Sequence, residues 1–162
     1  MLLGIPFQTA YVTTSIDLAA TMLADKLGVR RLRRQDDVTI DTDKGPMLLG
    51  LAHGWVGPTW LEVIQPIDGA VAIYRDWLSD GAAFRFHHIG VRAPDEAAYR
   101  RAMEAATAAG YPIAFSIDNP AFRAFYADTT EDLGHYVEYL QFLDASFFKA
   151  IPQNVDGCEI PS

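Results

Sequence analysis

The sequences FQTAYV at residues 7–12 and HHIGVR at residues 87–92 begin two copies of one pattern. In each copy, a short apolar run is followed at the same interval by residues that can start a helix, and the helical segment ends at a glycine. Each copy then closes with a strand-like segment that carries one glutamate, Glu62 in the first and Glu138 in the second. A repeat of this length indicates one supersecondary unit used twice, with a shared site between the copies.

The order of elements within each copy predicts the fold class. Alternating apolar residues and turn signals predict strands at residues 7–14, 29–40, 47–52 and 59–65, a helix after the first of them and a hairpin loop at 54–57. In that helix Leu18, Met22, Leu23 and Leu27 are expected to face the core. The second copy repeats the order from residue 84 onward. We therefore predict an α+β fold of two tandem βαβββ modules.

The division of the chain follows from the same pattern. We expect one domain over residues 1–162, with a first module at about 6–66, a linker at about 67–83, a second module at about 84–142 and a C-terminal tail at 143–162.

Composition excludes several classes of protein. Half of the 162 residues are hydrophobic, so the chain can bury a core. A formal net charge of −8 argues against nucleic acid or an anionic membrane as partner. The single cysteine, Cys158, excludes an intrachain disulfide and a thiolate metal cluster. Residues 1–6 lack the features of a signal peptide, and no apolar run is long enough to span a membrane. We expect a cytoplasmic protein.

Strand alternation predicts which polar side chains share a face. Because Ile89 and Val91 should pack against a helix, His88 should lie on the opposite, concave face, and the same parity places Gln8 there. The four repeat-related residues that would line this concavity are Gln8, Glu62, His88 and Glu138. Any one of them is equally well explained as a core or surface residue, but the set of four favours a divalent metal site.

Neighbouring residues receive weaker assignments. Trp60 and Tyr136 each precede a glutamate by two positions and would line the cavity as substrate-binding or core residues. Arg92 would share the face of His88 and bind a substrate carboxylate or pair with an acidic neighbour. By parity His87 and His135 should point to the faces opposite those of His88 and Glu138 and be structural or surface residues, and His53 is left unassigned.

On these motifs the chain resembles the vicinal oxygen chelate superfamily of glyoxalase I, bleomycin-resistance proteins and related dioxygenases. The resemblance covers about residues 6–142 and depends on HHIGV at 87–91, LEVIQP at 61–66 and GHYVEY at 134–139. The linker and the double histidine look most like methylmalonyl-CoA epimerases. The resemblance implies a U-shaped, cupped mixed sheet with helices outside, and a divalent metal bound by Gln8, Glu62, His88 and Glu138.

The chain departs from both closest branches. Glyoxalase I usually carries an asparagine at the place of Pro66 and arginines at the places of Val12 and Phe84, for binding glutathione. Epimerases usually carry a second glutamate base on the strand before the first-module glutamate, where residues 46–51 offer no carboxylate. The substrate-binding residues of neither branch are complete.

The preferred function is a metal-dependent isomerase or lyase that transfers a proton next to a carbonyl of a small, largely apolar substrate. Glu138 or Glu62 would act as general base, and Zn, Fe, Mn, Co or Ni would be the cofactor. One alternative is a non-catalytic drug- or metabolite-binding protein of the bleomycin-resistance type. A third is an extradiol-type dioxygenase, which needs two histidines where only one is expected. Whether the modules pair within one chain or across a homodimer stays open.

Overall fold

The computed structural model describes residues 4–144 and 146–159. The prediction that residues 1–6 are not a signal peptide falls partly outside the described residues, because Met1, Leu2 and Leu3 are not among them. In the first half of the chain the order is β1 (Ile5–Thr13), α1 (Ile16–Leu27), β2 (Arg33–Thr42), β3 (Gly45–Val56) and β4 (Thr59–Gly69). The short helices α2 (Ala72–Arg75) and η1 (Asp76–Leu78) follow.

The second half repeats this order. It runs through β5 (Phe84–Arg92), α3 (Glu96–Ala108), β6 (Ile113–Asp118), β7 (Phe122–Ala127), α4 (Thr130–Leu133), β8 (Tyr136–Phe142) and α5 (Ser146–Lys149). Among the residues that the structure describes, no helix is long and apolar enough to span a membrane.

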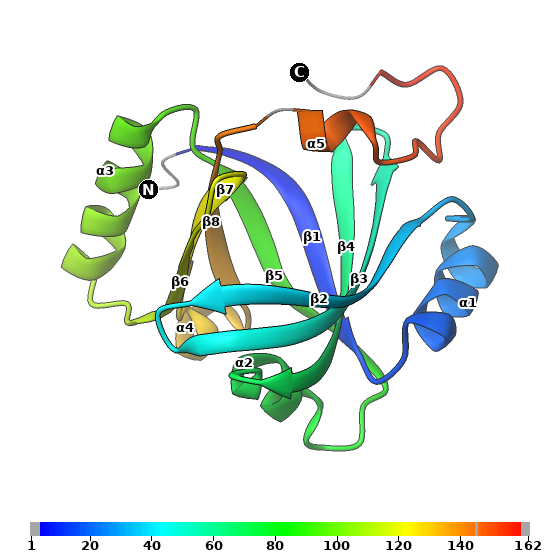
Figure 1. The fold of residues 1–162 in the computed structure, drawn as a ribbon, viewed down its shortest axis with the longest axis horizontal. Helices are drawn as coiled ribbons and strands as arrows, with labels where there is room; N and C mark the ends of the chain where they lie inside the picture. Colours follow the sequence, from blue (N-terminus) through cyan, green and yellow to red (C-terminus); the bar gives the residue numbers. More distant parts are fainter. Residues whose placement is uncertain (1–3, 145, 160–162) are drawn as a thin grey trace.

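All eight strands join in one curled sheet in the order β2-β3-β4-β1-β5-β8-β7-β6 (Figure 1). Within each half the first and last strands run parallel, β1 with β4 and β5 with β8, while β1 and β5 pair antiparallel where the halves meet. The sheet curls until the turn after β2 reaches β6, where the backbone N–H of Asp43 donates to the carbonyl of Ser116 at 3.1 Å. The predicted α+β, cupped mixed sheet is confirmed.

Two long helices cover the outside of the cup, because each buries one apolar stripe. Helix α1 begins at the N-cap Ser15, ends at the left-handed Gly28, and buries Ile16, Ala19 and Leu23 against β3 and β4. Helix α3 begins at the N-cap Asp95 and packs its alanines against β5, β7 and β8. The predicted inner stripe of α1 is wrong except for Leu23.

That stripe differs because residues 16, 19 and 23 share the face nearest to the sheet. Leu18, Met22 and Leu27 lie to the side of this face and are exposed.

The inside of the cup holds an apolar cluster drawn from both halves and from the linker. Residues of β3, β4, β7 and β8 contact one another there. Tyr74 of α2 packs into the same cluster, and its hydroxyl donates to that of Tyr126 at 3.2 Å. The C-terminal segment covers one end of the cup (Figure 1). There the N–H of Trp55 donates to the carbonyl of Pro152 at 2.8 Å, and Ile151 is buried against Trp55 and Trp60.

Candidate functional site

The four repeat-related residues lie on the four central strands of the sheet. Gln8 is on β1, Glu62 on β4, His88 on β5 and Glu138 on β8. In register Glu62 is opposite Ala10, and Glu138 is opposite Gly90. Small residues therefore separate the polar side chains, leaving them room to converge on the inner face.

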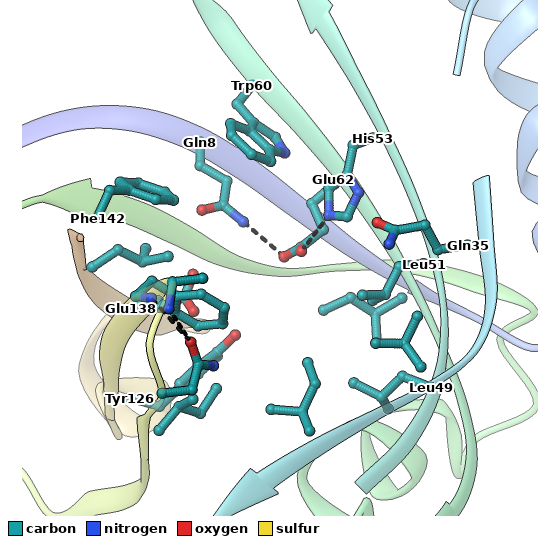
Figure 2. Close-up of a pocket in the computed structure, with 18 of the residues that line it drawn as sticks. Gln8, Gln35, Leu49, Leu51, His53, Trp60, Glu62, Tyr126, Glu138 and Phe142 are labelled. Carbon is teal, nitrogen blue, oxygen red and sulfur yellow. Dashed lines mark hydrogen bonds and ion pairs between the residues drawn. The ribbon is translucent and has the colours of Figure 1, made fainter. Parts of the chain in front are cut away.

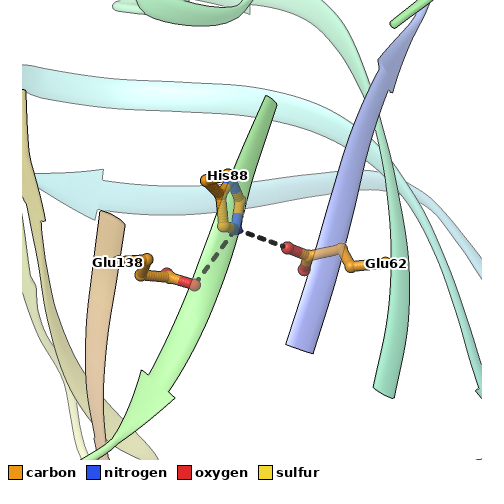
Figure 3. A group of neighbouring side chains, drawn as sticks. All are labelled: Glu62, His88 and Glu138. Atoms are coloured by element: carbon orange, nitrogen blue, oxygen red, sulfur yellow. Dashed lines mark ion pairs between the residues drawn. The ribbon is translucent and has the colours of Figure 1, made fainter. Parts of the chain in front are cut away.

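Three of the four form a compact cluster (Figure 3). The Nε2 atom of His88 lies 3.2 Å from Oε2 of Glu138 and 3.5 Å from Oε2 of Glu62. One ligand atom from each of these residues lies within 4.8 Å of the others. His88 and Glu138 are buried, and the Glu62 side chain is nearly so. The structure therefore brings together three of the four side chains that the sequence pattern singled out, although they are 26 or more positions apart in the chain.

Gln8 contacts the cluster through Glu62. Its Nε2 donates to Oε2 of Glu62 at 2.7 Å, as Figure 2 shows. The amide lies directly across from Gly90, where an added Cβ atom would collide with the side chain of Gln8. The absence of a side chain at position 90 therefore makes room for Gln8.

His53 is the residue that sequence reasoning missed. Strand β3 runs on to Val56, through the predicted loop, so His53 pairs directly opposite Glu62. Its Nε2 lies 2.9 Å from Oε1 of Glu62, and the ring is buried (Figure 2). The hairpin turn at Gly57 was the available signal, because counting back from it sets His53 against Glu62. The expectation of one histidine on the concave face is wrong.

His87 also differs from its prediction. Ala10 pairs with His88 and Tyr11 with Phe86, so His87 is the extra residue of a β-bulge. The bulge breaks strand alternation, and the Nδ1 atoms of His87 and His88 lie 2.9 Å apart. His135, in contrast, is half-buried and directs Nδ1 to the carbonyl of Leu133 at 2.9 Å.

Burial and mutual contact shift the ionisation of the cluster. Burial alone would raise the pKa of Glu62, but hydrogen bonds and charge from His53 and His88 outweigh it and lower that pKa to about 2. Burial opposes the charge on His88, yet Glu138 and Glu62 raise its pKa to about 9. Burial raises the pKa of Glu138. Burial and the adjacent His88 lower the pKa of His87 well below its ordinary value.

Three buried polar atoms at the site have no well-aligned hydrogen bond. Nε2 of His88 and Oε2 of Glu138 meet each other as an ion pair at 3.2 Å, and Oε1 of Gln8 makes no hydrogen bond. Leaving a buried polar atom unsatisfied costs about 1–3 kcal/mol, so incompletely bonded atoms of this kind favour a ligand between them. One imidazole nitrogen with carboxylate and amide oxygens is a donor set that suits a divalent ion. The residues present therefore fit the implied metal.

Gln8, Glu62 and Glu138 form part of the wall of a cavity of about 230 Å³, and Figure 2 shows residues that line it. The rest of the wall is mostly apolar and comes from β2, β3, β6, β7 and β8, with Leu49, Leu51, Ile117, Phe122 and Leu140 among its residues. Trp60 lines this cavity, as expected. Tyr136 instead stacks on His87 with ring centroids 4.9 Å apart, and Arg92 lies near the end of β5; neither is among the residues that line the cavity.

Comparison with known proteins places the fold. No family model and no curated protein sequence matches the chain. Among solved structures, methylmalonyl-CoA epimerase from Mycobacterium tuberculosis is 16% identical, with a TM-score of 0.58 over 91% of this chain and 92% of that one. A Streptomyces coelicolor methylmalonyl-CoA epimerase variant in complex with 2-nitronate-propionyl-CoA is 13% identical, with a TM-score of 0.60 over 87% and 99%.

A methylmalonyl-CoA epimerase in complex with methylmalonyl-CoA and NH4+ gives the same TM-score of 0.60 at 12% identity, over 98% of this chain and 99% of that one. At such low identity these likenesses establish the fold alone. The chain has the fold of the vicinal oxygen chelate superfamily, the superfamily that its repeated sequence pattern resembles.

Proposed function

We propose that this protein is a divalent-metal-dependent isomerase or lyase that transfers a proton next to a carbonyl of a small, largely apolar substrate. The observation that carries the proposal is the cluster of Glu62, His88 and Glu138, whose nitrogen and oxygen atoms face one another beside a largely apolar cavity that both carboxylates line. The similarity of the fold to epimerases supports proton transfer as the reaction class.

The same three residues would hold the ion, with Oε1 of Gln8 as a fourth ligand. Zn, Fe, Mn, Co and Ni all accept one imidazole with oxygen donors. Such an ion, when bound, polarises a carbonyl oxygen and lowers the pKa of the adjacent C–H group.

Glu138 is our candidate for the general base. Its Oε2 contacts Nε2 of His88, at 3.2 Å, and burial raises its pKa toward the range in which a carboxylate accepts a proton efficiently at neutral pH. In the proposed step the C–H proton moves to a Glu138 oxygen while the electron pair delocalises onto the carbonyl oxygen. The proton then returns to the same carbon, for epimerisation, or to its neighbour.

Glu62 is the second candidate base, but its surroundings favour a fixed role. Gln8 donates to one of its oxygens and His53 lies beside the other, so the carboxylate is oriented from both sides. We assign Glu62 mainly to ligation.

The cavity wall indicates the charge of the substrate. In the described part of the chain no lysine or arginine lines the cavity, and the wall already contains two carboxyl groups. A carboxylate next to the reacting carbon would find no side-chain cation there, and burying an unpaired charge is costly. We propose that the group attached to the reacting carbon is uncharged. The charged part of a coenzyme A ester, as in the similar structures, would have to lie outside the cavity.

The first experiment is elemental analysis of the purified wild-type protein beside His88→Ala, with His135→Ala as the control histidine. We expect about one divalent ion per chain in the wild type and control, and loss of the ion from His88→Ala. The holoenzyme is then incubated in deuterium oxide with 2-oxo acids, acyl thioesters and 2-hydroxyketones, and deuterium uptake next to the carbonyl is followed by NMR. A metal-loaded protein that exchanges no proton in any of them would refute the reaction class.

A binding protein of the bleomycin-resistance type is the second candidate, favoured by the apolar wall alone. A wild-type protein that neither contains nor takes up metal, yet binds apolar ligands, would establish it. The dioxygenase alternative gains His53 as a second inner histidine, but His53 lies outside the three-residue cluster. The predicted homodimer and cytoplasmic location stay predictions.

A further inference from the structure

His87 is the buried histidine for which the proposed mechanism has no use. It is fully buried, and the bulge in β5 turns it toward the linker and the core instead of the outer helices. Its ring stacks on Tyr136 and lies 4.9 Å from the ring of Tyr74 and 5.5 Å from that of Trp77. These three aromatic rings hold the imidazole in one orientation.

Both ring nitrogens of His87 have a partner. Nε2 lies 3.2 Å from the backbone carbonyl of Ile73 in α2, and Nδ1 lies 2.9 Å from Nδ1 of His88. A carbonyl oxygen can only accept a hydrogen bond, so Nε2 of His87 must carry a proton. At 2.9 Å the two facing Nδ1 atoms have room for one proton between them, and this proton belongs either to His87 or to His88.

The surroundings of His87 indicate that the proton between the two Nδ1 atoms belongs to His88. If His87 held both protons it would be a buried cation among aromatic rings, a carbonyl and another imidazole, and no carboxylate contact of His87 appears in the described structure. Burying such an unpaired charge is expensive. His87 is therefore neutral and accepts at Nδ1, and His88 donates from its own Nδ1.

The consequence for the cluster concerns Nε2 of His88. With Nδ1 committed to His87, Nε2 is the nitrogen that faces Glu62 and Glu138 and can present a lone pair to a ligand. We propose that His87 is a positioning residue that fixes the tautomer and the ring orientation of His88 for metal binding. The chain of hydrogen bonds starts at Ile73, so α2 in the linker between the copies helps to set the geometry of the site.

This inference rests on the proposed metal site, but its first test does not need a metal. Long-range ¹H–¹⁵N NMR of metal-free wild-type protein reports which imidazole nitrogens carry a proton. We expect His87 to show protonated Nε2 and unprotonated Nδ1, and His88 to show protonated Nδ1. A protonated Nδ1 on His87 would overturn the proposal whatever the metal content of the protein.

The second test separates the acceptor from the shape of the ring. His87→Phe keeps an aromatic ring against Tyr136 but removes the acceptor, whereas His87→Asn places an amide oxygen near the position of Nδ1. We expect His87→Phe to weaken Co²⁺ binding about 10- to 100-fold, and His87→Asn to stay within about 3-fold of wild type. Circular dichroism and thermal unfolding check that both variants fold.

Full Co²⁺ affinity in a folded His87→Phe variant would refute the positioning role. Equal loss in both variants, with the expected NMR pattern absent in the wild type, would reduce His87 to a packing residue. If wild type itself binds no Co²⁺, the proposed function fails, and the NMR experiment still decides the hydrogen-bond chain.

Discussion

Metal binding should release a proton, because the raised pKa of His88 means that its imidazole is charged in the metal-free protein. With that pKa at about 9, only about one molecule in a hundred has neutral His88 at pH 7. A metal must displace the proton from Nε2, so apparent affinity should rise about tenfold for each pH unit between 6 and 8. The raised pKa of Glu138 acts in the same direction. The lowered pKa of Glu62, about 2, leaves no proton to release there.

Calorimetric titration with Co²⁺ at pH 7 in PIPES and in HEPES measures this proton release, because the two buffers differ in ionisation enthalpy. We expect about one proton per ion, and at least that many if Glu138 contributes. A histidine of ordinary pKa would release roughly a quarter of a proton at pH 7 and would no longer affect affinity at higher pH. His135→Gln removes a histidine outside the cluster and should leave the count unchanged. Release below about a third of a proton, with a flat pH profile, would refute the charged state of His88.

Four further predictions follow from the site. His88→Ala and Glu138→Gln should each lose metal and activity while keeping the circular dichroism spectrum of the folded protein; full metal occupancy in either would remove that residue from the ligand set. Gly90→Ala places a Cβ on the amide of Gln8 and should cost about 1–3 kcal/mol in the free energy of unfolding, measured with urea, and weaken metal binding. In the metal-free protein the raised pKa of His88 stabilises the fold below pH 6.5, and as pH rises through about 9 up to roughly 3 kcal/mol should be lost in urea titrations; constant stability over that range would contradict it. Calorimetry should show that 2-hydroxyacetophenone binds at least tenfold tighter than mandelate, and that Gln35→Arg on the cavity wall, but not Gln35→Met, reverses the order.

The repeat in the sequence was enough to predict the fold and to bring Glu62, His88 and Glu138 together. Each of these residues lies on the first or last strand of its copy, and these strands come together at the centre of the sheet. Strand parity within a single segment then fixed the correct face for all three.

What parity could not reveal was any feature that depends on pairing between distant strands. The bulge at His87 exists because β5 is offset by one residue against β1, and nothing within residues 84–92 indicates that offset. His53 was missed because its role depends on where the hairpin turns, not on its immediate neighbours. The placement of Ile151 against Trp55 likewise joins segments almost a hundred positions apart, with no local signal to mark it.

The antiparallel pairing of β1 with β5 has a consequence for how the cluster can be damaged. The cluster lies across this junction, with Glu62 from the first copy and His88 and Glu138 from the second. Neither copy supplies all three residues, so the cluster exists only when the two halves pair in the correct register. A change that shifts β1 against β5 would disperse these side chains without altering any of them.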